Sequence, residues 1–181
     1  LRRKIAAFKN TQKITKAMKM VAAAKLKRSQ DRILAARPYA HKMRSVLSNL
    51  SQRVNRSVHP LLQKREGKKI EVLVITSDRG LCGGFNNNLC KFVLRWLDEN
   101  AVDGKEVDLS FCGRRGFMAL NKLVNVNTNY EGVTAKPNYK KAGEISGGLT
   151  ESFLDGQYDE IYLVYNHFKN ALTQIPTLKK I

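Results

Sequence analysis

A glycine-rich segment is the part of the sequence whose residue types and spacing could bind a ligand. It reads VITSDRGLCGGFNNNL, over residues 74–89. The pattern predicts a buried strand, a loop that contains Gly80, Gly83 and Gly84, and the start of a helix. Loops of this kind hold phosphates in many α/β proteins, because the N–H groups at a helix N-terminus attract anions. The first question is therefore whether this loop binds a nucleotide.

The spacing of the glycines matches neither of the common nucleotide-binding patterns, G-x-G-x-x-G or G-x-x-x-x-G-K-[ST]. The next expected strand, 106–113, leads into Arg114 and Arg115 and supplies no carboxylate for a ribose. The two arginines would suit a 2′-phosphate, so an NADP-linked enzyme stays open as an alternative. We favour the interpretation that the glycines allow a tight turn. Asp78 and Arg79 then position the loop or a partner surface.

The histidines and cysteines show no spacing typical of a catalytic or metal-binding site. The three histidines stand apart from each other and from any cysteine or carboxylate at metal-ligand spacing: His41, His59 and His167. The three cysteines, Cys82, Cys90 and Cys112, are odd in number and form no disulfide framework, which favours a reducing compartment. Without a neighbouring base, Cys82 is expected to be a bystander. The sequence therefore predicts no catalytic residue, no bound cofactor and no metal site.

Positive charge is concentrated in the first third of the chain. Residues 1–69 contain 20 of the 33 Lys and Arg but only two acidic residues, Asp31 and Glu66, so they carry the whole net charge of +18. The chain therefore has two parts with different partners. No segment approaches the roughly 20 apolar residues needed to span a bilayer, and the basic start has no apolar stretch behind it that would make a secretory signal.

The basic part is expected to be a single long helix. Residues 1–59 contain no glycine and are rich in good helix formers. Apolar residues recur at spacings of three and four, as in the a/d seam of a coiled coil. The seam runs through Ile33, Ala36, Ala40, Met43, Leu47, Leu50 and Val54, and an earlier seam through Ile14, Ala17, Val21 and Ala24.

Pro38 lies inside this pattern, and a proline usually kinks or breaks a helix. The alternative is two helices, with Pro38 near the first turn of the second. The seam nevertheless keeps its phase from Ile33 through Ala40. We therefore expect one slightly bent helix of about 85 Å, at 1.5 Å per residue.

A helix of this kind requires a partner, because its seam is narrow and its like charges repel. The partner is expected in another chain or in sequence beyond Ile181. A nucleic acid is the alternative partner for a basic helix. The stretch MKMVAAAKL at 18–26 is instead smooth and apolar, and no aromatic residues alternate with the charges as single-strand binding favours. A sleeve of protein lined partly by acidic groups fits this surface better.

The rest of the sequence predicts an α/β domain. After a polar hinge at 64–69, the expected strands are 70–77, 106–113, 125–130 and 159–166, and the expected helices are 86–99, 114–122 and 139–154. The last segment, 170–181, is expected to be an edge strand, where Pro176 is tolerated. The alternation predicts a mostly parallel sheet with helices on its faces.

Three motifs together resemble the gamma subunit of F-type ATP synthases. They are NTQKITKAMKMVAAAKL at 10–26, ARPYA at 36–40 and SDRGLCGGFNNNL at 77–89. The resemblance runs over all 181 residues, and the GGFN form is bacterial or chloroplast-like rather than mitochondrial. In this family an N-terminal and a C-terminal helix form an antiparallel coiled coil inside a hexamer of alpha and beta subunits. A three-layer Rossmann-like domain forms the foot, beside the epsilon subunit and the c-ring, and the glycine loop is no nucleotide site.

The resemblance implies two domains, with residues 1–62 as half of the coiled coil and residues 68–181 as the Rossmann-like foot. The family's C-terminal helix is expected beyond residue 181. The implied function is that of a non-catalytic central rotor shaft, which couples ion-driven rotation of the c-ring to conformational change at the beta-subunit catalytic sites. The implied location is peripheral, on the cytoplasmic face of a bacterial inner membrane or the stromal face of a thylakoid.

The resemblance also suggests which residues contact partners. The expected contacts with the acidic lever of the beta subunit are Lys16, Met18, Lys19, Lys25 and Arg28. The expected foot contacts, with the epsilon subunit or the c-ring, are Arg37, Tyr39, Arg79 and Cys82.

Overall fold

The computed structural model describes residues 1–55, 59–63, 65, 67–101 and 104–181. The chain divides into two compact units, Leu1–Asn55 and Arg56–Ile181.

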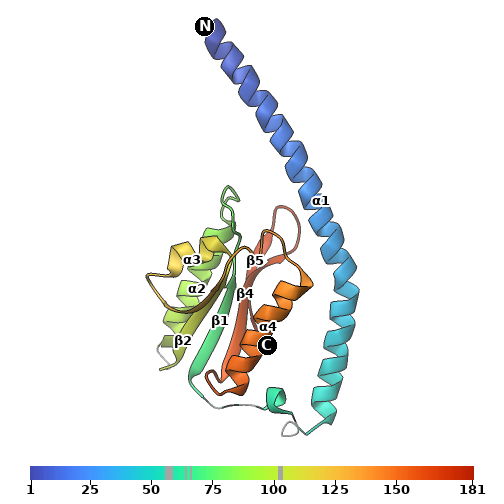
Figure 1. Cartoon of the computed structure of the whole chain (residues 1–181), viewed down its shortest axis with the longest axis vertical. Helices are drawn as coiled ribbons and strands as arrows, with labels where there is room; N and C mark the ends of the chain where they lie inside the picture. Colours follow the sequence, from blue (N-terminus) through green and yellow to red (C-terminus); the bar gives the residue numbers. More distant parts are fainter. Residues whose placement is uncertain (56–58, 64, 66, 102–103) are drawn as a thin grey trace. The chain divides into compact units, whose positions relative to one another are not determined.

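The first unit is one helix, α1 (Arg2–Arg53), of 52 residues, with Pro38 in its interior. It confirms the expectation of a single helix rather than two, and Figure 1 shows it as one continuous, bent ribbon. The helix ends at Arg53, earlier than residue 59, and at 1.5 Å per residue it is about 78 Å long. None of its residues is buried. The packing that normally stabilises a long helix therefore does not come from within this unit.

The second unit is built on a five-stranded sheet with the order β3-β2-β1-β4-β5. The strands are β1 (Lys69–Ile75), β2 (Glu106–Cys112), β3 (Asn125–Tyr130), β4 (Glu160–Phe168) and β5 (Gln174–Lys180). Strands β1 to β4 run parallel, and β5 pairs antiparallel with β4 at the edge. The mostly parallel sheet and the edge position of the last strand are both as expected from the sequence.

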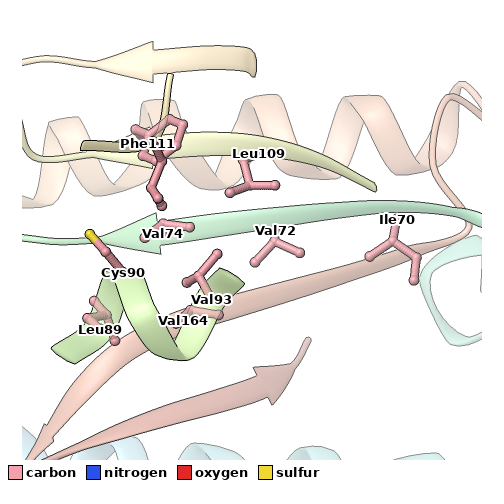
Figure 2. Close-up of a cluster of buried hydrophobic side chains, with 10 residues drawn as sticks. Ile70, Val72, Val74, Leu89, Cys90, Val93, Leu109, Phe111 and Val164 are labelled. Atoms are coloured by element: carbon pink, nitrogen blue, oxygen red, sulfur yellow. The ribbon is translucent and has the colours of Figure 1, made fainter. Parts of the chain in front are cut away.

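Helices cover both faces of this sheet (Figure 1). They are α2 (Phe85–Ala101), α3 (Arg114–Leu120) and α4 (Tyr139–Leu154), and a short 3-10 helix, η2 (Pro60–Leu62), precedes β1. Successive residues of a strand point to opposite faces. Accordingly Val72 and Val74 pack with α2 and α3, whereas Leu73 packs with Leu149 of α4. Figure 2 shows the cluster on the α2 face, where Leu89 and Val93 of α2 lie against the strands.

The three-layer α/β fold is therefore confirmed, together with the long helix that precedes it. Most elements of the α/β unit differ from the expected ones by one to four residues at a boundary, such as β4, which extends to Phe168 rather than 166, whereas β3 and α4 have the expected bounds. Part of the expected polar hinge, Lys64 and Glu66, lies outside the described residues.

Candidate partner-contact surfaces

The glycine-rich loop follows β1, at the carboxyl end of the parallel strands, and its two ends are tied together. The Ser77 N–H donates to Oδ1 of Asn86 at 3.0 Å, and Asn86 Nδ2 donates back to Ser77 Oγ at 2.8 Å. The same amide nitrogen lies 3.1 Å from Cys82 Sγ. Asn86, in the first turn of α2, thus closes the loop into a fixed shape.

Asp78 fastens this loop to two others. Its Oδ1 accepts from the N–H of Arg114 at 3.1 Å, and its Oδ2 accepts from Thr134 Oγ1 at 2.7 Å and the N–H of Ala135 at 2.8 Å. Burial opposes the charge of the carboxylate, but these hydrogen bonds and nearby Lys141 outweigh it and lower the pKa of Asp78. Asp78 therefore holds the loop in place, as its position in the sequence suggested.

A close approach of two backbones explains the glycines after β2. Thr76 Oγ1 donates to the carbonyl of Gly113 at 3.0 Å and accepts from the N–H of Gly116 at 2.8 Å. Gly113 has φ +112°, and a Cβ there would overlap the backbone carbonyl of Thr76. These glycines let the start of α3 lie directly against the end of β1, which places Arg115 beside the glycine-rich loop; its N–H donates to the carbonyl of Ser77 at 3.1 Å.

The loop and the start of α2 enclose an open depression of about 490 Å³. It is lined by Arg79, Gly80, Leu81, Cys82, Gly83, Asn86, Asn87 and Arg115. These eight residues include two arginines and no carboxylate. Leu81 is fully exposed and has φ +61°, a conformation unusual for a residue with a side chain. Cofactors usually bind in enclosed, mostly apolar clefts. This surface is basic, shallow and carries an exposed leucine, so it is better suited to contact another protein than to bind a cofactor.

Two of the expected foot contacts, Arg79 and Cys82, line this same depression. The other two, Arg37 and Tyr39, flank Pro38 on α1 and belong to the other unit. Tyr39 is exposed.

The five expected beta-subunit contacts lie on α1 and are all exposed. Successive residues of an α-helix are about 100° apart, so these five do not share one face. Arg28 continues the seam of Ile14, Ala17, Val21 and Ala24, with Met18 and Lys25 beside it. Lys16 and Lys19 lie on the opposite face. A helix that covers the seam would leave Lys16 and Lys19 free to contact a surrounding sleeve.

Three residues with specific roles in the structure were not identified from the sequence. Leu81 lies inside the glycine motif, and Arg65 lies inside the polar hinge. Glu71, which is 2% exposed, lies within the apolar strand IEVLVITS. Of these three residues, only Glu71 could have been identified from the sequence, because a charged residue in a strand that is buried on both faces requires hydrogen-bond partners.

Among the described residues, no helix is both long and apolar enough to cross a bilayer. The described residues also contain no group of three or more histidine, cysteine or acidic side chains arranged to hold a metal ion.

Comparison with known proteins places the chain in a family. Residues 1–181 match the family model described as ATP synthase. The ATP synthase gamma chains of Trichlorobacter lovleyi and Geobacter metallireducens are each 41% identical over 181 residues, covering 100% of this chain and 63% of theirs. That of Anaeromyxobacter dehalogenans is 44% identical over 180 residues, covering 96% of this chain and 61% of its own. The chain thus spans less than two thirds of the length of these relatives.

Solved structures agree with the sequence comparisons. The central stalk/c-ring structure of the Tetrahymena thermophila mitochondrial ATP synthase contains a chain that is 28% identical, with a TM-score of 0.70, covering 93% of this chain and 71% of that one. The rotor of the Euglena gracilis mitochondrial ATP synthase contains a chain with a TM-score of 0.57 and 18% identity, which shows likeness of fold alone; the match covers 99% of this chain and 60% of that one. On the full-length family match and these relatives, the chain belongs to the ATP synthase family, as a gamma chain.

Proposed function

We propose that this chain forms part of the central rotor shaft of an F-type ATP synthase. In this role it couples ion-driven rotation of the membrane c-ring to conformational change at the catalytic sites of the beta subunits. The observation that carries the proposal is α1, which has 52 residues, an apolar seam and not one buried residue. Its seam therefore requires cover from other polypeptide, and its excess of Lys and Arg suits an acidic surrounding.

The two units have different roles in this proposal. Helix α1, the helical part of the expected domain 1–62, forms half of an antiparallel coiled coil that enters the hexamer of alpha and beta subunits. Residues 68–181 form the foot, which contacts the epsilon subunit and the c-ring. The complex holds the chain peripherally, on the cytoplasmic face of a bacterial inner membrane or the stromal face of a thylakoid.

Coupling then follows from differences in contact free energy. An asymmetric shaft presents a different face to each beta subunit in turn, and each face favours the open or the closed form of that catalytic site. The chain itself is not catalytic. Lys16 and Lys19, opposite the seam, attract an acidic lever without requiring one fixed geometry. The alanines at 22–24 keep the helix slim enough to turn past its neighbours.

Co-purification tests the proposal directly. The chain, tagged and expressed with its alpha, beta, epsilon and c subunits, should be recovered with all of them after detergent solubilisation. Recovery of the chain alone would contradict the proposal. Tight binding to nucleic acid with a steep salt dependence, measured by filter binding, would instead support the alternative of a nucleic-acid-binding helix.

A further inference from the structure

The two edges of the sheet in the α/β unit differ in how they are protected. Among the described residues, no strand pairs with the outer side of β3 or of β5. Exposed edges in natural proteins usually carry a proline or charged side chains, which prevent pairing with other chains. Strand β5 has Pro176, Lys179 and Lys180, whereas β3 reads NVNTNY and has neither a proline nor a charge. The edge of β3 is therefore the unprotected one.

The accessible part of this edge is the first half of β3 and the residues just before it. Residues 125–127 are exposed, whereas residues 128–130 are half-buried. The register of β3 against β2 shifts after Val126, as at a β-bulge, and a bulge re-aims the rest of a strand. Leu123, which is 66% exposed, places an apolar side chain just before the strand. We call residues 122–127 the open edge.

The two faces of the open edge have different side chains. Val126 is in register with Leu109, which is buried on the face that α2 and α3 cover. Asn127 lies on the opposite face, where its Nδ2 donates to Oε1 of buried Glu71 at 3.0 Å and so fixes the edge. Neighbouring side chains on one face of a sheet interact directly. A strand added here therefore needs an apolar side chain beside Val126 and a hydroxyl or amide beside Asn127.

A depression at the start of the open edge provides positive charge. It has a volume of about 460 Å³ and is lined by Leu97, Lys105, Val107, Lys122, Leu123, Val124 and Asn125. These seven described residues include two lysines and no carboxylate. The acidic side chains at the start of β2, Glu106 and Asp108, line a separate depression with Tyr158. An acidic residue of a partner would therefore meet complementary charge at this end of the edge.

We propose that the open edge binds an extended, acidic segment of a partner protein, which adds to the sheet as a further strand. Main-chain hydrogen bonds to β3 hold the segment, and its alternating side chains match the two faces. Its acidic residues lie against Lys105 and Lys122. A second copy of this chain is less suitable, because residues 122–127, KLVNVN, contain no carboxylate to meet these lysines. This inference goes beyond the proposed function and does not depend on it.

The test uses the full chain and short synthetic peptides of alternating valine and threonine. One acidic peptide has two glutamates at its amino end and another has them at its carboxyl end, which covers both directions of an added strand. Two basic peptides have lysines in place of the glutamates. Calorimetric titration measures the affinity of each peptide. Hydrogen exchange of the amides at 125–127 shows whether the peptide binds at the open edge.

Two variants alter the open edge, and each has a matched control. Val126→Lys places a charge on the edge strand, and Ile175→Lys does the same at an exposed position of β5. Lys122→Glu reverses the charge beside the depression, and Lys91→Glu reverses an exposed charge on α2. Lys122→Glu alters only an exposed side chain, so it tests the site even if Val126→Lys fails to fold.

We expect one of the acidic peptides to bind and to slow exchange at 125–127 at least about ten-fold. Val126→Lys should weaken binding at least about ten-fold, because a charged edge opposes pairing. Lys122→Glu should weaken binding of the acidic peptide about three-fold or more, and this variant should bind the basic counterpart better than the acidic peptide. Ile175→Lys and Lys91→Glu should bind as the wild type does.

Three results would overturn the inference. If neither acidic peptide protects the amides at 125–127, no strand adds at this edge. If the acidic and basic peptides bind equally well, the partner segment is not selected by its charge. If the same amides become protected without peptide as the chain concentration rises, the occupant is a second copy of this chain instead.

Discussion

The hydroxyl group of Ser152, on α4, donates a 3.0 Å hydrogen bond to Oε2 of Glu71, at the centre of β1. The other carboxylate oxygen accepts from Ser110 Oγ on β2 at 2.6 Å and from Asn127 Nδ2 on β3 at 3.0 Å. One buried acidic side chain therefore joins three neighbouring strands to the helix that covers them. This network lies on the face of the sheet opposite the cluster of Figure 2.

Replacing Glu71 should destabilise the α/β unit. In Glu71→Leu, the buried hydroxyl groups of Ser110 and Ser152 and the more exposed amide of Asn127 lose this acceptor, and we expect a loss of about 2–4 kcal/mol of unfolding free energy. Glu71→Gln should cost less, because its carbonyl oxygen can still accept. Urea denaturation of the full chain measures both. Glu144→Leu, at an exposed position of α4, is the control, and equal stabilities for the Glu71 and Glu144 variants would contradict the assigned role of the network.

Gly113→Ala should destabilise the chain more than Gly132→Ala. Both glycines have positive φ, but a Cβ at Gly113 would overlap the carbonyl of Thr76, whereas one at Gly132 would have open space. We expect about 1 kcal/mol for the Gly132 variant, from conformation alone, and at least about 3 kcal/mol for Gly113, from conformation and overlap together. Thermal denaturation monitored by circular dichroism gives the comparison. Similar melting temperatures would mean that the two backbones do not meet at Thr76.

Asp78 should make the unfolding free energy of the chain depend on pH in the acidic range. Its pKa is lowered in the folded state, so its stabilising contribution is fully present above the unfolded pKa of about 3.9 and is lost as the pH falls through the lower folded value. Asp78→Asn should therefore be less stable than wild type at pH 7, and the difference should shrink below about pH 4. Unfolding free energies over pH 2–7 test this, with exposed Asp98→Asn as control. A difference that is constant with pH would contradict the assignment.

Leu81→Gly should stabilise the isolated chain. Leu81 is fully exposed, so its replacement loses no buried surface, and its φ of +61° costs a residue with a side chain about 1 kcal/mol or more. We expect a gain of about 0.5–1 kcal/mol in Leu81→Gly and no gain in Leu81→Ala, which keeps the strain. Chemical denaturation distinguishes the two variants. A loss of stability in Leu81→Gly would show that the leucine packs against this chain.

Met18→Lys should lower coupling in the assembled complex. Met18 is exposed on α1 beside the seam, within a stretch already rich in lysine. An added cation there would repel its neighbours or form a misplaced ion pair with the beta subunit. We expect the ratio of ATP-driven pumping to hydrolysis to fall at least about two-fold. Met18→Leu, which keeps size and apolarity, should behave as wild type, and pumping that is unchanged in Met18→Lys would count against this contact.

Local patterns in the sequence were sufficient to predict most of the architecture. The unbroken phase of the seam from Ile33 through Ala40 predicted one helix across Pro38, and the structure shows one. Pro176 predicted an edge strand, and β5 lies at the edge. These predictions succeeded because helix and strand periodicities repeat within a few residues, so a short window of sequence contains the whole signal. The resemblance of three motifs added the family.

The hydrogen bonds between residues far apart in the sequence were decided by the tertiary structure. Arg65 reaches the carbonyl of Phe153, 88 residues away, and Ser152 reaches Glu71, 81 residues away. Neither pairing has a local pattern, because each depends on the order of the strands and on which face α4 covers. The sequence by itself determined the long basic helix, the three-layer fold and the glycine loop. Only the packed structure decided that Arg65 binds carbonyls at the end of α4, because hydrogen bonds between distant segments form only once the sheet has placed them side by side.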